Sequence, residues 1–369
     1  MKKLYALFTV LCVIFSSLGG VYASEEKVMS LSLTEAIETA LTDNSKIIAN
    51  GYRQYANQKN LESAHANKKD AINSSKNMPI LSATTINELL LKKGYYVEAA
   101  KMQQRLTIRE ADKIKSSIAY SVTEAYYNLV LMDKLIAAAN NAHNLALSNL
   151  KIIQAQYDMG LVAELDYENA SLAADNAKSM VDSYILNREI ADANLKILLN
   201  IPYETSLILT DEIETEEMSF DVDADIATAM DSRYDIAAAK EAMELSGLYF
   251  DIAKSFTSGS AVYNTANADY IDAQNTYKTA VDGITLSLRS IYNNTITTHT
   301  AMDLARRQYE NKLKAYEAVK LKYDLGMISN LELTNGINEL YDAQVSYANA
   351  KLGYRMAVEK YKYEISTGL

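Results

Sequence analysis

The sequence predicts an all-α protein built from long antiparallel coiled-coil helical hairpins in two tandem repeats. The 369 residues include only 12 Gly and 2 Pro, too few for the frequent turns of an all-β fold. A 4-3 spacing of apolar residues runs from Ile118 to Tyr157, as in a coiled-coil seam. The segment around Tyr157 also recurs 166 residues later in the chain. Few helix breakers, a long seam and a duplication together predict paired rods.

The first 23 residues have the pattern of a secretory signal peptide. Two lysines precede a short apolar run, and Val21-Tyr22-Ala23 provides a cleavage site. The apolar run is shorter than the roughly 20 residues that a membrane-spanning helix requires, which disfavours an uncleaved anchor. We therefore expect an exported mature chain that begins at Ser24 and lacks Cys12, the only cysteine.

The first helical repeat is expected over residues 24–200. Ser32-Leu33-Thr34-Glu35 is typical of a capping box that starts a short helix. A long helix is expected from about Arg105 to Tyr157, and eleven of its twelve seam positions from Ile118 on are apolar, with His143 as the exception. A helix of this length would extend about 80 Å, too far for a compact domain. Gly160 predicts a tip turn near residues 157–165.

An acidic connector is expected over residues 201–224, and the second helical repeat over residues 225–369. The connector includes a short strand-like run, Leu207-Ile208-Leu209. The second repeat should open with a helix from Asp225 to Ser255 and turn near residues 323–331. In the second turn, Tyr323-Asp324-Leu325-Gly326 matches Tyr157-Asp158-Met159-Gly160 in register. Chance similarity between helices does not readily produce such a match, so we infer an internal duplication.

The sequence carries no pattern typical of an enzyme, and we expect no enzymatic activity, cofactor or metal site. Its three histidines, His65, His143 and His299, are far apart and lack the spacing of metal ligands. The sequence has no phosphate-binding loop and no nucleophile elbow. A net charge of −11 argues against a nucleic-acid partner.

The chain resembles the TolC-like outer-membrane efflux family. The resemblance rests on the two Tyr-Asp-x-Gly turns, on the duplication, and on two further runs: Leu31-Ser32-Leu33-Thr34-Glu35-Ala36-Ile37 and Glu124-Ala125-Tyr126-Tyr127-Asn128. It implies an α-barrel protomer that assembles as a homotrimer in the cell envelope, at the outer membrane. It also implies partners, a periplasmic adaptor protein and an inner-membrane pump, and passive conduction of exported substrates.

The resemblance also assigns candidate site residues. The adaptor-contact tips would consist of four residues in each repeat: Met159, Gly160, Leu161 and Val162, and Leu325, Gly326, Met327 and Ile328. Asp166 and Glu332 would be acids at the pore entrance. Where a second acid can follow in the family, this chain has Asn169 and Asn335, which argues against an ion-paired iris.

In that family each repeat also inserts two barrel strands between its first and second helices. The corresponding windows, residues 77–94 and 255–270, lack the alternating runs of about 9–11 residues that a spanning strand needs. We therefore expect little or no β-barrel, so a periplasmic or extracellular location is an alternative. Two functions stay open: a subunit of a trimeric export conduit, and a barrel-less extracytoplasmic coiled-coil structural or scaffold protein without conduction.

Overall fold

The computed structural model describes residues 28–74, 85–215, 219–256 and 259–368. These residues form nine helices and one two-stranded sheet, which confirms the predicted all-α fold. The expected signal peptide lies outside the described residues. Within the described ranges, no helix combines the length and the apolar character needed to cross a bilayer.

Two helices of 64 residues each dominate the molecule, α5 (Tyr95–Asp158) and α9 (Ala261–Asp324). Each is about 96 Å long at 1.5 Å per residue. Each packs against two shorter helices in succession, one along each half of its length. These shorter partners are α3 (Ser45–Ser74) and α6 (Glu164–Leu199) for α5, and α8 (Tyr234–Phe256) and α10 (Asn330–Ser366) for α9. Both predicted hairpins are therefore present.

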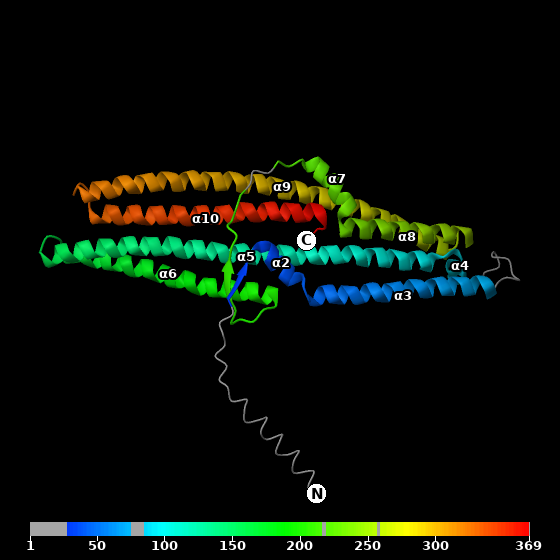
Figure 1. Cartoon of the computed structure of the whole chain (residues 1–369). Coiled ribbons are helices and arrows are strands. Elements are labelled where there is room, and N and C mark those ends of the chain that lie inside the picture. Colours follow the sequence, from blue (N-terminus) through cyan, green and yellow to red (C-terminus); the bar gives the residue numbers. More distant parts are fainter. Residues whose placement is uncertain (1–27, 75–84, 216–218, 257–258, 369) are drawn as a thin grey trace, which may run out of the picture.

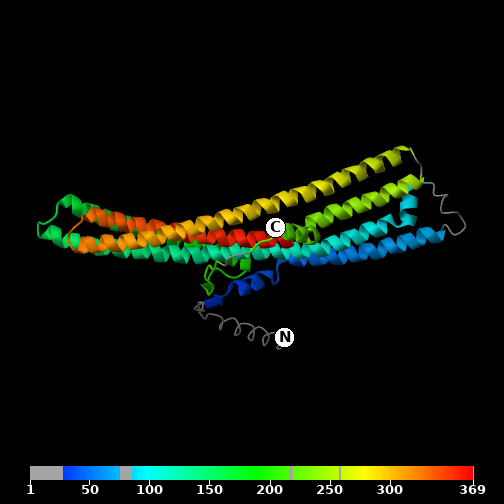
Figure 2. The same ribbon diagram turned by 90° about the horizontal axis from the view of Figure 1, so that it is seen from above.

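The two long helices run along one helical layer, separated by a shorter helix (Figures 1 and 2). Near the two glycine turns, α10 packs between α9 and α5, which gives the order α9–α10–α5–α6. Along the other half α8 takes the place of α10, which gives the order α9–α8–α5–α3. Both turns lie at the same end of the layer (Figure 1).

The predicted seam of α5 faces the interior of the layer. None of its twelve side chains is exposed, and Val122 and Leu129 are fully buried. The seam helix begins earlier than the expected Arg105, at Tyr95, immediately after Gly94. Gly94 has a φ of 91° and ends the short helix α4 (Ile86–Lys93). The left-handed backbone conformation of Gly94 thus separates α4 from α5, a boundary that the sequence pattern did not indicate.

The helix α4 occupies the described part of the first barrel window. Leu89 and Leu90 of α4 form a core cluster with Ile252 of α8, so α4 links the two repeats at the end opposite the turns. In the second window α8 ends at Phe256 and α9 begins at Ala261. Residues 75–84 and 257–258 lie outside the description, and the described residues of both windows contain no strand.

A small parallel sheet lies against the middle of α5. Strand β2 (Ser206–Leu209) is the strand-like run of the connector, and it pairs with β1 (Val28–Leu31). Helix α2 (Leu33–Leu41) follows β1 and begins at the predicted capping box. The fully buried Tyr126 of α5 donates its hydroxyl to the Leu31 carbonyl at 2.9 Å and accepts a bond from the Asp211 N–H at 3.0 Å. One side chain thus ties the connector to the first repeat.

Replacing Tyr126 with Phe is expected to lower the free energy of unfolding by about 1–3 kcal/mol. The change leaves the Asp211 N–H without this partner, whereas the Leu31 carbonyl keeps the bond from the Thr210 N–H. Urea unfolding followed by circular dichroism measures the effect. The control is Tyr203→Phe, since the Tyr203 side chain is 61% exposed. Equal midpoints for the two variants would contradict the expectation.

The single helix expected from Asp225 to Ser255 is wrong, because the chain breaks into α7 (Val222–Ser232) and α8 at Arg233. Arg233 is extended, with φ −69° and ψ 138°. Its buried guanidinium binds both carboxylate oxygens of Asp235, at 2.9 and 2.7 Å. It also binds the carboxylate and the backbone carbonyl of Glu364, at 2.6 and 2.9 Å. The break lets Arg233 hold the end of α10 against the corner between α7 and α8.

Candidate functional site

The first glycine turn joins α5 to α6 in a Schellman motif. Gly160 has a φ of 73°, and its N–H donates to the Tyr157 carbonyl at 2.8 Å. The Leu161 N–H donates to the Gln156 carbonyl, also at 2.8 Å. These two bonds satisfy carbonyls that the end of a helix leaves without partners. A Cβ atom at Gly160 would meet nothing within 4 Å, so the backbone conformation alone accounts for the glycine.

The second turn, from α9 to α10, repeats this geometry. Gly326 has a φ of 70° and donates to the Tyr323 carbonyl at 2.9 Å, while Met327 donates to the Lys322 carbonyl at 2.8 Å. The two matching sequence segments therefore form two copies of one backbone motif at one end of the molecule.

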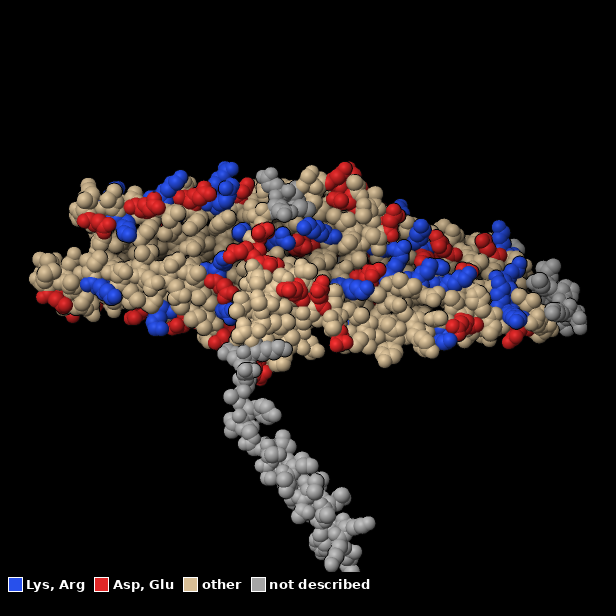
Figure 3. Space-filling view, viewed as in Figure 1, with Lys and Arg blue, Asp and Glu red and all other residues tan. Residues whose placement is uncertain are grey.

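Both turns present apolar side chains to solvent. Met159 and Leu161 are 65% and 68% exposed, and their counterparts Leu325 and Met327 are 66% and 69% exposed. Val162 and Ile328 are half-buried. In Figure 3 the outermost atoms at the turn end are mostly uncharged. Exposed apolar groups that cluster at equivalent places usually mark a surface that a partner covers.

Two further leucines belong to this surface, although they were not among the expected tip residues. Leu165 and Leu331 are 64% and 65% exposed and lie in the first turn of α6 and α10. They occupy matching positions in the duplicated segment. That match was the sequence signal that could have identified them. We call the eight expected residues together with these two leucines the tip surface.

The two expected pore-entrance acids lie just behind the tip surface and make local bonds. The Asp166 carboxylate accepts from the Ala163 N–H at 3.3 Å. The Glu332 carboxylate accepts from the Ser329 N–H at 2.9 Å and from the Ser329 hydroxyl at 3.0 Å. The bond from the Ser329 N–H, followed by the bond from the Ser329 hydroxyl, holds the pKa of Glu332 below its ordinary value. Both acids therefore cap the start of a helix.

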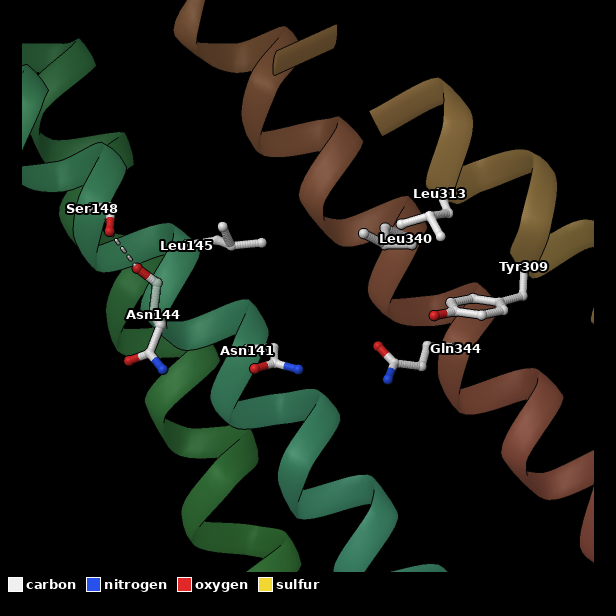
Figure 4. A pocket seen from close by; sticks show the side chains of 8 residues that line it. All are labelled: Asn141, Asn144, Leu145, Ser148, Tyr309, Leu313, Leu340 and Gln344. Carbon is white, nitrogen blue, oxygen red and sulfur yellow. Dashed lines mark hydrogen bonds between the residues drawn. The ribbon is translucent and has the colours of Figure 1, made fainter. Parts of the chain in front are cut away.

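A groove runs between the two hairpins next to the tip half of α5 (Figure 4). It has a volume of about 390 Å³, and its walls come from α5 on one side and from α9 and α10 on the other. The lining residues are amide, hydroxyl, phenol and leucine side chains: Asn141, Asn144, Leu145, Ser148, Tyr309, Leu313, Leu340 and Gln344. Such groups offer hydrogen bonds and apolar contacts, and this lining contains no ionisable acid–base pair.

The structure keeps the three histidines apart. His143 is half-buried in the α5 seam, and the His299 ring lies 4.9 Å from the ring of Tyr354. Across the described ranges, no three His, Cys, Asp or Glu side chains are placed to share a metal ion.

Similarity to known proteins is weak in sequence. No protein-family model matches the chain. A stretch of 113 residues is 23% identical to the toxin and drug export protein A of Aggregatibacter actinomycetemcomitans. The match covers 31% of this chain and 25% of that protein, so the chain corresponds to only about a quarter of its length.

Similarity to solved structures extends over most of the chain. The outer membrane protein VceC of Vibrio cholerae superposes with a TM-score of 0.71 at 13% identity, covering 91% of this chain and 97% of VceC. The outer membrane channel CmeC of Campylobacter jejuni superposes with a TM-score of 0.67 at 16% identity, covering 90% of this chain and 85% of CmeC. The chain therefore has the fold of the TolC-like outer-membrane efflux channels, as the sequence resemblance predicted.

Proposed function

We propose that the mature protein is a subunit of a TolC-like export conduit in the cell envelope. The main support is the tip surface, because two equivalent turns at one end present apolar side chains that the described residues leave exposed. A periplasmic adaptor attached to an inner-membrane pump is the partner that the family resemblance implies. The fold of outer-membrane channels and the partial match to an export protein support the same function.

Conduction in this proposal is passive, and the chain supplies the wall of the conduit. One protomer is an open layer of helices, so a lumen requires further copies, three by the family resemblance. Asp166 and Glu332 would place fixed carboxylates beside the entrance while their capping bonds keep the helix starts ordered. No chemical step is needed, and the pump would provide the driving force.

Mass photometry and negative-stain electron microscopy of the purified mature chain test this proposal. We expect particles with three times the monomer mass and end-on images with a central hole. A stable monomer at micromolar concentration, or solid rods without a lumen, would contradict conduction. Solid rods would instead favour the structural or scaffold function.

A further inference from the structure

The helical layer has two free edges. Near the turns, α9 lies at one edge and α6 at the other, with α10 and α5 between them. The two edges belong to different repeats and have different sequences. If the α9 edge of one copy packs on the α6 edge of the next, the contact is heterologous, because the two copies use different surfaces. Repeated heterologous contact closes into a ring when the rotation between copies permits.

The α6 edge combines an apolar stripe with a regular row of acids. The stripe contains four side chains that are 59–61% exposed: Leu172, Leu186, Ile190 and Ile197. Beside it, four exposed carboxylates recur at every seventh residue: Glu168, Asp175, Asp182 and Glu189. Asp182 also pairs with Lys178 of the same helix, at 3.3 Å. We call these four residues the acidic ladder. A spacing of seven keeps them in one line along a coiled-coil helix.

The α9 edge carries the opposite charge beside its own apolar residues. Leu286, Leu304 and Leu321 are 72%, 57% and 61% exposed. Arg307 and Lys314, also exposed, are seven residues apart. Neighbouring basic residues are already paired, Arg306 with Asp303 and Lys312 with Glu339. Among the described residues, Arg307 and Lys314 have no ion-pair partner.

We propose that the α9 edge of one copy packs on the α6 edge of the next, with Arg307 and Lys314 inserted between steps of the acidic ladder. This inference rests on the proposed ring and names the contacts that order its copies. Counted from Gly326, Lys314 and Arg307 lie about 18 and 28 Å along α9. Counted from Gly160, the first three ladder acids lie about 12, 22 and 33 Å along α6. With the turns level, each base therefore falls between two acids.

The charge pattern also disfavours two other ways of joining the edges. An α6 edge against a second α6 edge would place the acidic ladder against itself, and like charges in contact repel. In the half of the layer away from the turns, the charges of the two edges are reversed. Here the edge helix α3 contains five Lys and Arg and only two acidic residues. The facing part of α9 carries the exposed acids Asp269, Asp272 and Asp282. A neighbour turned end for end would bring Arg307 and Lys314 onto the basic α3.

Cysteine cross-linking tests the contact directly, because the mature sequence after residue 23 contains no cysteine. The variant Asp175→Cys with Lys314→Cys is expected to form covalent dimers and trimers with a short bismaleimide. Its two cysteines lie on opposite edges of one chain, so they cannot react within it. Either single-cysteine variant should stay monomeric on a denaturing gel. Dimers from a single-cysteine variant would show like edges in contact and would overturn the proposal.

Charge reversal provides a second test. Glu168→Lys with Asp175→Lys should weaken self-association about tenfold at physiological salt, as should Arg307→Glu with Lys314→Glu. The four changes together should restore it to within about twofold of the original chain. The control, Glu38→Lys with Glu124→Lys, makes the same charge change at exposed residues of α2 and α5, which form neither edge, and should have no effect.

The outcomes separate this inference from the proposed conduit. If rings persist but the opposite-edge cysteines fail to cross-link, the contact at the acidic ladder is wrong and the proposed conduit is unaffected. The same conclusion follows if the quadruple variant self-associates no more tightly than the double variants. Monomers in the original chain would overturn both.

Discussion

Replacing Leu161 and Met327 with Asp is expected to weaken adaptor binding by at least about a hundredfold and to stop export. Both side chains are more than two-thirds exposed at the centre of the tip surface, so each is available as an apolar anchor. Buried anchors at protein interfaces often contribute about 2 kcal/mol or more each. An Asp in the same place would have to lose its hydration on docking without gaining a partner.

The variant should fold normally, because both side chains are mostly exposed and the Schellman bonds involve only the backbone. Circular dichroism and mass photometry should therefore be unchanged. Surface plasmon resonance against a purified periplasmic adaptor of the source organism measures the affinity, and dye efflux from cells measures export. Normal affinity and export in a folded Leu161→Asp, Met327→Asp protein would show that the tip surface is not the docking site.

Two matched variants isolate the effect of the tip surface. Ile108→Asp with Tyr203→Asp makes the same charge change at side chains that are 52% and 61% exposed elsewhere, and it should bind normally. Leu161→Ile with Met327→Leu keeps the surface apolar and should also bind normally. Loss of binding in the first control would point to net charge as the cause. Loss of binding in the second control would point to a change of fold.

The turns and the seam could be predicted from the sequence because local signals determine them. Gly160 and Gly326 each follow the end of a long helical pattern. Each turn requires a left-handed backbone conformation at the glycine and no close approach of other atoms. The seam from Ile118 onward is periodic over forty residues, and a pattern of that length has no competing interpretation.

Other features depend on contacts between distant residues, which no local pattern reveals. The break between α7 and α8 has neither Gly nor Pro, and Arg233 is held there by Glu364, 131 residues away. Strand β1 exists because β2 pairs with it, 178 residues along the chain. The exposed leucines Leu165 and Leu331 belong to regular helices, so their match in sequence shows that they are equivalent, and their exposure beside the turns marks them as tip residues.

The partly buried cluster at this break is expected to have a large effect on stability. Replacing Arg233 with Met should lower the free energy of unfolding by about 2–4 kcal/mol at pH 7, less than for a fully buried pair because the Asp235 side chain is 39% exposed. Arg233 is only 5% exposed, and its removal leaves the carboxylates of Asp235 and Glu364 without the guanidinium that neutralises them. The end of α10 would also lose its anchor at the Glu364 carbonyl.

The loss should depend on pH. Burial raises the pKa of Asp235, but the hydrogen bonds and charge of Arg233 outweigh burial and leave that pKa below its ordinary value. In the original chain this group therefore contributes stability above about pH 4 and loses the contribution as the pH falls through its folded pKa. Without Arg233 the Asp235 carboxylate protonates more readily. The difference between variant and original should thus be largest near pH 7 and shrink toward pH 3.

Urea unfolding at fixed protein concentration and at several pH values measures both effects. Arg289→Met is the matched control, because Arg289 pairs with Asp223 at the surface, where both side chains are at least half exposed. That pair should contribute less than about 1 kcal/mol. Adding Asp235→Asn and Glu364→Gln to Arg233→Met should recover part of the lost stability, since neutral amides are less costly to leave unpaired than charges. A difference that is independent of pH would mean that Arg233 acts through packing and its bond to the Glu364 carbonyl, and not through the carboxylates.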